Sequence, residues 1–257
     1  MGSPSRNVKP MRVLSLVHQT DAAGGVFDDA VLEAGHELDE WVVSASPAPP
    51  APVEDYGAFL VFGGAMHVDQ EDRHGWLGDE RRLLQRLVAR EVPVLGVCLG
   101  GQLLARALHG HVRRLPSPEI GWIDVELTPE AAADPVFSGL PARFPSFQWH
   151  LYHFEEPDGA VPLARSERSL QAFRAGPAAW GVQFHPEVTH ASIEHWTRSY
   201  DPREDGQVDV PALLAETETH IAAWNAFGRE LCGRFLAFAE TTRGSRGATT
   251  RATSPRS

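Results

Sequence analysis

The chain has 257 residues and a formal net charge of −11. This length is enough to bury the core of one α/β domain, while the negative charge argues against a general binder of nucleic acid or of a membrane surface. No apolar run approaches the length that spans a bilayer, and the run 13–17 is too short for a secretory signal. With only two cysteines and no metal-ligand spacing, the sequence predicts a cytoplasmic protein without a disulfide framework, metal or cofactor.

Segments typical of strands and helices alternate along the first hundred residues. We expect strands at 11–17, 37–43, 57–62 and 92–95, and helices at 27–34, 79–90 and from 103 onward. This order predicts an open, mostly parallel sheet with helices on both faces, of the flavodoxin-like type. Further strand candidates, separated by Pro and Gly turns, predict a small antiparallel addition; they are 121–127, 170–174 and 179–184.

The two ends of the chain differ in composition from the rest. Residues 1–10 and 241–257 offer few apolar side chains to bury, so both are predicted to be disordered. Between them, residues 11–240 are expected to form a single domain. Its last part, 190–240, is predicted to be a helical extension that packs against the sheet.

Cys98 stands between glycines in the segment GVCLGGQ, residues 96–102. The apolar run before it predicts a buried strand, and the run after it predicts the start of a helix. Flanking glycines permit a tight turn, and the N–H groups of a helix N-terminus favour a thiolate. A free cysteine is more often a small buried side chain, but this turn favours a nucleophile.

A cysteine nucleophile needs a base and a group that orients the base. His185 follows the expected strand 179–184, and Glu187 can lie on the same face of extended chain, where its carboxylate would favour the imidazolium. His-Pro-Glu alone is more often a surface turn, but its pairing with the cysteine turn favours catalysis. Gly63 and Gly64 follow another strand, where they form either a simple turn or donors to an oxyanion.

Three segments together resemble the class I glutamine amidotransferase family, over roughly residues 11–188: they are 62–64 (FGG), 96–102 (GVCLGGQ) and 181–187 (GVQFHPE). The resemblance implies that Cys98 attacks the side-chain amide of glutamine. His185 would serve as base and then as acid, oriented by Glu187, and the N–H groups of Leu99 and Gly64 would form the oxyanion hole. The resulting acyl-enzyme would be hydrolysed to glutamate.

The same resemblance implies the substrate-binding residues. Gln102 would help to hold the glutamine, and the segment 147–154 (FQWHLYHF) is similar to the family's substrate-contacting loop. His150 matches that loop, whereas Leu151 and Tyr152 depart from its pattern. The segment is closer to stand-alone members that resemble the amidotransferase part of GMP synthase, among whose relatives are hydrolases of γ-glutamyl peptides.

Three functions therefore remain open. The first is a glutamine amidotransferase that passes ammonia to a separate synthetase partner, since no synthetase-like region accompanies the amidotransferase-like one. The second is a γ-glutamyl peptide hydrolase that acts alone with the same Cys98, His185 and Glu187. The third is a non-catalytic binding or regulatory module, against which the presence of all three residues argues.

Overall fold

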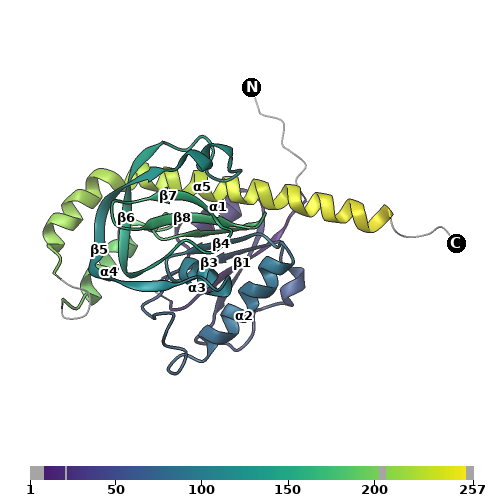
Figure 1. The fold of residues 1–257 in the computed structure, drawn as a ribbon, viewed down its shortest axis with the longest axis horizontal. Coiled ribbons are helices and arrows are strands. Elements are labelled where there is room, and N and C mark those ends of the chain that lie inside the picture. The colour runs from purple at the N-terminus through teal and green to yellow at the C-terminus, as the bar shows by residue number, and fades with distance from the viewer. Residues whose placement is uncertain (1–8, 21, 203–206, 253–257) are drawn as a thin grey trace.

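The computed structural model describes residues 9–20, 22–202 and 207–252 of the chain. Through them runs a nine-stranded sheet in the order β2-β1-β3-β4-β9-β8-β7-β5-β6 (Figure 1). Its strands are β1 (Arg12–Val17), β2 (Glu37–Val42), β3 (Ala58–Val61), β4 (Val94–Val97), β5 (Val112–Leu127), β6 (Arg143–Phe154), β7 (Val161–Arg165), β8 (Leu170–Ala175) and β9 (Ala179–Val182). The helices are α1 (Val26–Glu33), α2 (Trp76–Ala89), α3 (Leu99–Ala107), α4 (His190–Ser199) and α5 (Val210–Ala252), with 3-10 turns at Val53–Asp55 and Pro129–Ala133.

The first five strands in space, from β2 to β9, are all parallel. Three of them, β3, β4 and β9, are buried at every residue, as expected for strands that helices cover on both faces. Because parallel strands end at the same edge, this half of the sheet brings the residues after β1, β3, β4 and β9 together. The α/β fold with a parallel core is confirmed.

Helices cover both faces of this parallel half (Figure 1). On one face α1 packs against α5, and their aromatic side chains Phe27, Trp224 and Phe235 join the core. On the other face α2 packs against α3, where Leu84 and Leu104 are fully buried. The parallel strands are therefore fixed from both sides, which makes their carboxyl ends a rigid platform.

The other four strands are antiparallel, and two of them, β6 and β7, were not expected from the sequence. The segment 147–154, interpreted above as a loop, lies within β6, so that interpretation is wrong. Strand β5 begins at Val112 rather than 121, and its pairing with β6 is interrupted only between Arg114 and Glu119. Pro116 and Pro118 stand in that interruption, where their missing N–H groups cost no ladder hydrogen bonds.

The carboxyl-terminal part differs from the prediction of disorder over 241–257. Helix α5 continues to Ala252, because each residue added to a formed helix gains a hydrogen bond. Arg243 also donates to the carbonyl of Pro10 at 3.0 Å, which ties the helix to the start of β1. Residues 1–8 and 253–257 lie outside the described residues. Within the described part, no helix is both long enough and apolar enough to cross a membrane.

Candidate active site

Cys98 occupies a sharp turn between β4 and α3. Its φ of 51° and ψ of −107° lie in a region that side chains other than glycine rarely adopt. Two backbone hydrogen bonds hold this turn: Cys98 N–H donates to Val182 O at 2.8 Å, and Gly100 N–H donates to Phe62 O at 3.1 Å. The thiol thus stands at the N-terminus of a helix, on a strained strand-to-helix turn.

The glycines around Cys98 are required by close packing. A Cβ on Gly96 would lie 2.6 Å from the Gly100 carbonyl, and a Cβ on Gly100 would lie 2.1 Å from the carbonyl oxygen of Val61. Both distances are far shorter than real contacts, so no larger residue fits. The G-x-C-x-G spacing therefore lets helix α3 approach β3 and β4 closely.

His185 and Glu187 form a buried pair at the end of β9. Their Nδ1 and Oε1 atoms are 2.8 Å apart, and each side chain is 4% exposed. Although burial lowers the pKa of His185, the charge of Glu187 and the interaction with Cys98 raise it to about 10. Because Nδ1 pairs with Glu187, the interaction with Cys98 falls to Nε2, which has no other partner among the described residues. This nitrogen of the imidazole is therefore placed for proton transfer at the sulfur.

Helices α1 and α5 hold the His185–Glu187 turn from outside. Trp224 on α5 donates to the carbonyl of His185 at 2.8 Å, and Asn225 donates to the carbonyl of Val188 at 2.7 Å. Val26, the first residue of α1, donates its N–H to the carbonyl of Glu187 at 2.9 Å. The helical extension therefore packs on the base of the site as well as on the sheet.

Gly64 and Leu99 are neighbours beside Cys98. A Cβ on Gly64 would lie 3.3 Å from Leu99 Cδ2, and a Cβ on Gly63 would lie 3.6 Å from Cys98 Cβ. The N–H of Leu99 belongs to the first turn of α3, which the intrahelical ladder leaves unpaired. Among the described residues, the N–H of Gly64 has no acceptor. Both donors are therefore free for an oxygen atom next to the sulfur.

A cavity of about 780 Å³ opens over these groups. Of the residues selected from the sequence, those that line it are Cys98, His185, Gly64, Leu99, Gln102, His150, Leu151 and Tyr152. Glu187 lies behind His185 and does not line the cavity. The chemistry-bearing turns of the parallel half form one side, and β6 forms the other. Among the described residues, no cluster of His, Cys, Asp and Glu could hold a metal ion.

Gln102 joins α3 to β6. Its Nε2 donates to the carbonyl of Tyr152 at 2.9 Å and to Gln183 Oε1 at 3.3 Å, whereas its Oε1 has no partner among the described residues. Gln183 in turn donates to Cys98 Sγ at 3.6 Å. A chain of amide groups thus connects β6 with the sulfur and leaves an acceptor atom open.

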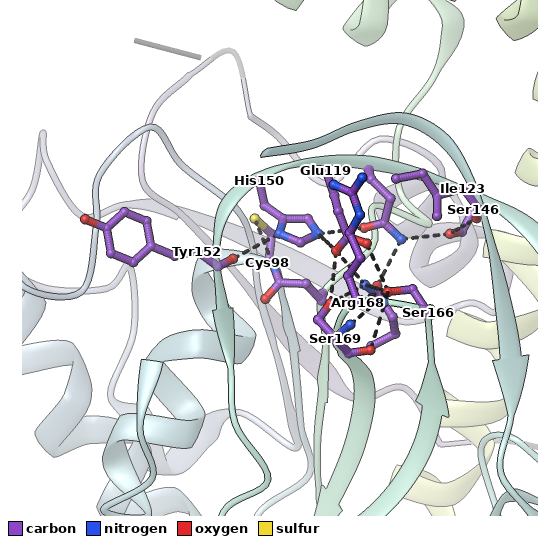
Figure 2. Close-up of polar contacts among 12 residues, drawn as sticks. Cys98, Glu119, Ile123, Ser146, His150, Tyr152, Ser166, Arg168 and Ser169 are labelled. Carbon is purple, nitrogen blue, oxygen red and sulfur yellow. Dashed lines mark hydrogen bonds and ion pairs between the residues drawn. The ribbon is translucent and has the colours of Figure 1, made fainter. Parts of the chain in front are cut away.

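His150 is held between the backbone of Tyr152 and a buried carboxylate, as Figure 2 shows. Its Nδ1 lies 3.0 Å from the carbonyl of Tyr152, and its Nε2 lies 3.0 Å from Gln148 Oε1 and 3.2 Å from Glu119 Oε2. Because a carbonyl only accepts, Nδ1 carries a proton. Burial lowers the pKa of His150, and Glu119 opposes that shift. The imidazole is therefore fixed in orientation from both sides.

Glu119 is 1% exposed and is the centre of a polar network behind β6 (Figure 2). It accepts from the hydroxyls of Ser166 at 3.0 Å and Ser169 at 2.9 Å, and from Gln171 at 3.2 Å. Burial alone would raise the pKa of Glu119. The hydrogen bond and charge of His150, followed by the hydrogen bonds of the two hydroxyls, outweigh this effect and hold the pKa below its usual value. A carboxylate so satisfied can stay ionised inside the protein.

Sequence reasoning did not find Glu119, nor the buried pair His18–Glu80 that lies beside Gly63. Glu80 lies in the charged run 79–82, and Glu119 stands between Pro118 and Ile120, so no local pattern distinguishes either of them. His18 offered one signal: it directly follows the strand 11–17, at the same edge of the sheet as the glycine pair.

These features define the protein class. The family model of class I glutamine amidotransferases matches residues 28–196, and the chain belongs to this family. Within that class, it is 32% identical over 146 residues to a subunit of the glutamine-hydrolysing GMP synthase of Pyrococcus abyssi, covering 54% of this chain and 73% of that one. The glutamine amidotransferase-like protein YfeJ of Salmonella typhimurium is 28% identical over 188 residues, covering 72% of this chain and 79% of its own length.

A solved structure extends the similarity to nearly the whole fold. The crystal structure of a glutamine amidotransferase from Thermotoga maritima superposes with a TM-score of 0.81 at 30% identity, covering 88% of this chain and 98% of that one. The chain is thus a family member similar both to the Pyrococcus GMP synthase subunit and to YfeJ.

Proposed function

We propose that this protein hydrolyses the γ-amide of glutamine through Cys98 and passes the ammonia to a separate acceptor enzyme. One observation carries the proposal: a cysteine at a strained helix N-terminus shares a cavity with a buried His–Glu pair. Its similarity to a subunit of a glutamine-hydrolysing enzyme supports a separate partner. Two free cysteines favour a reducing compartment, the cytoplasm.

The reaction proceeds in two halves. The Cys98 thiolate attacks the γ-carbonyl carbon, and the N–H groups of Leu99 and Gly64 stabilise the oxyanion. His185 gives its Nε2 proton to the leaving nitrogen as the C–N bond breaks, which releases ammonia and leaves a thioester. His185 then removes a proton from water as that water attacks the thioester, and glutamate departs with the thiolate restored. Glu187 keeps the imidazole oriented throughout.

Substrate binding falls to the α3–β6 side of the cavity. Gln102 Oε1, which has no partner among the described residues, is suited to accept from the α-ammonium group. Leu151 and Tyr152 line the same cavity and would contact the carbon chain. His150 stands beside them, with its ring fixed by Glu119.

A second candidate is hydrolysis of γ-glutamyl peptides, with water as the final acceptor. The cavity volume of about 780 Å³ lies in the range that holds drug-sized ligands, well above the needs of glutamine. Trp149 and Trp196 line it, with ring centroids 5.9 Å apart. Arg73 and Arg114 also line it and make no ion pair with a described residue. Such cations would suit the carboxylate of a peptide.

The test is a substrate panel on the purified protein. Glutamine, glutathione and a γ-glutamyl dipeptide are each supplied at equal concentration, and glutamate release is measured over time. Release from glutamine supports the amidotransferase, and a rate that rises with an added synthetase supports ammonia transfer. Release from peptides alone favours the second candidate. No release from any substrate, with a synthetase present, would support a non-catalytic module and reject both proposals.

A further inference from the structure

A buried charge pair, His18–Glu80, lies next to the active site and has no part in the reaction described above. His18 follows β1 and is fully buried, while Glu80 is 2% exposed on the inner side of α2. His18 Nε2 lies 2.9 Å from Glu80 Oε2, and the ring stacks on Trp76 with centroids 5.3 Å apart. A buried ion pair is rarely the most stabilising choice for a core, so its presence beside the site calls for a functional explanation.

Each ring nitrogen of His18 faces an oxygen atom. Its Nδ1 lies 2.9 Å from the carbonyl oxygen of Gly63, which can only accept, so Nδ1 carries a proton. Nε2 faces the carboxylate of Glu80 and donates as well. Burial alone would lower the pKa of His18, but the charge of Glu80 and these hydrogen bonds raise it above its ordinary value. The geometry and the raised pKa of His18 therefore favour an imidazolium that faces Glu80.

The Gly63–Gly64 peptide transmits this contact to the active site. A trans peptide is planar, so its C=O and its N–H point in opposite directions. His18 binds the carbonyl of Gly63 on one side, which directs the N–H of Gly64 away from His18. Gly63 itself packs against the reacting groups, since a Cβ there would lie 3.0 Å from His185 Cε1 and 3.6 Å from Cys98 Cβ. Two successive glycines impose little orientation of their own.

We propose that His18 is a positioning residue that holds the Gly63–Gly64 peptide with its N–H aimed at the oxyanion, and that Glu80 keeps His18 charged for this task. The inference rests on the proposed function, because it needs Gly64 as an oxyanion donor. A charged donor on the carbonyl also polarises the peptide and strengthens its N–H as a donor. The catalytic donor is thus fixed and activated from behind.

Three changes to the pair test this role. His18→Asn keeps an N–H donor near the position of Nδ1 but removes the charge, Glu80→Gln removes the counterion, and His18→Leu with Glu80→Met removes both without leaving a buried charge. The matched control is His36→Leu, which removes another buried histidine that pairs with a glutamate, Glu240, at 3.1 Å outside the cavity. Each variant is assayed with glutamine and with γ-glutamyl-p-nitroanilide.

We expect the double variant to lose about 10²- to 10³-fold in kcat, the usual effect of an oxyanion donor, with KM changed less than about threefold. His18→Asn should retain part of the rate, which a purely structural role would not require. Alkylation of Cys98 by iodoacetamide, a displacement that forms no oxyanion, should keep its rate in every variant. His36→Leu should keep its kcat.

The outcomes separate the two proposals. Turnover by the unmodified protein together with an undiminished double variant would overturn the positioning role alone. The positioning role would also be overturned if the alkylation rate falls in proportion to kcat, because the loss of activity would then come from a less reactive Cys98. Absence of turnover by the unmodified protein on both substrates would reject the proposed function, and the positioning role with it.

Discussion

The parallel and antiparallel halves of the sheet position the residues of the site in different ways. The parallel half, β2 to β9, places short strands side by side; β3, β4 and β9 are buried at every residue, and the turns that follow these three strands line the cavity. The antiparallel half, β8 to β6, includes the long strands β5 and β6, and residues 149–152 of β6 line the cavity. The parallel half carries Cys98, His185 and Gly64 on backbone turns. The antiparallel half carries His150 on a strand backed by the buried Glu119.

This difference suggests a division of labour. Groups placed by backbone turns have little conformational freedom, and reacting groups need such a fixed orientation. Their positions depend on glycines and on backbone hydrogen bonds such as the one from Cys98 N–H to Val182 O at 2.8 Å. Groups on β6 depend on side-chain networks, which can be altered without moving the turns. Changes to the parallel half should therefore reduce kcat, and changes to the antiparallel half should mainly raise KM.

The largest effect is expected for Cys98→Ala. Removing the proposed nucleophile leaves only binding and oxyanion stabilisation, so kcat should fall by about 10⁴-fold or more. The matched control is Cys232→Ala, which removes the other buried thiol, a group whose pKa burial raises and which lies outside the cavity. Glutamate release and thermal unfolding are measured for both. If Cys232→Ala loses activity while Cys98→Ala keeps it, Cys98 is not the nucleophile.

A slightly smaller loss is expected for Glu187→Gln, about 10³- to 10⁴-fold in kcat by analogy with other triads. The pH profile adds a sharper readout. With a pKa of about 10, the His185 imidazolium persists through neutral pH and is lost only as pH rises through that value. Removing the Glu187 charge should move this alkaline limb to lower pH. A limb that stays in place would show that Glu187 does not set the charge of His185.

The sequence sufficed for the parallel half because its signals are local. Cys98 lies between glycines at a strand-to-helix junction, and His185 and Glu187 are two residues apart after a strand. Such short patterns predict both the α/β fold and which residues meet. The turn geometry, with Cys98 at a φ of 51°, agrees with that prediction, while the catalytic roles stay predictions.

The antiparallel half was missed because its determinants are not local. Pro116 and Pro118 read as breaks in a strand, yet they occupy an interruption of the β5–β6 pairing that a single sequence does not show. Strand β6 mixes aromatic and polar residues without clean alternation, since Gln148 and His150 are buried in the Glu119 network. The pair His18–Glu80 joins residues 62 positions apart, so only the folded chain identifies it.

An intermediate effect is expected from the antiparallel half when Glu119 is changed. Glu119→Ala removes the partner of His150 and of two hydroxyls, and loss of one member of a buried pair typically destabilises a protein by about 3–5 kcal/mol. Glu119→Gln keeps the shape and should cost less. In the Gln variant we expect KM for the substrate to rise about tenfold, because His150 loses its charged partner and keeps only the neutral acceptors Gln148 Oε1 and Tyr152 O, each at 3.0 Å, while kcat changes little. A fall in kcat with unchanged KM would contradict the division of labour.

The smallest effect is expected for Arg114→Gln, which tests whether the cavity binds the carboxylate of a γ-glutamyl peptide. Arg114 lines the cavity opposite Tyr152 in the β5–β6 register and makes no ion pair with a described residue. If it binds a peptide carboxylate, KM for a γ-glutamyl dipeptide should rise about three- to tenfold, the order expected for one exposed charge contact, while KM for glutamine stays the same. Its neighbour Arg113, which pairs with Glu155, provides the control Arg113→Gln. Equal shifts in the two variants would mean that only the overall charge of the rim matters, and the peptide subsite would then be rejected.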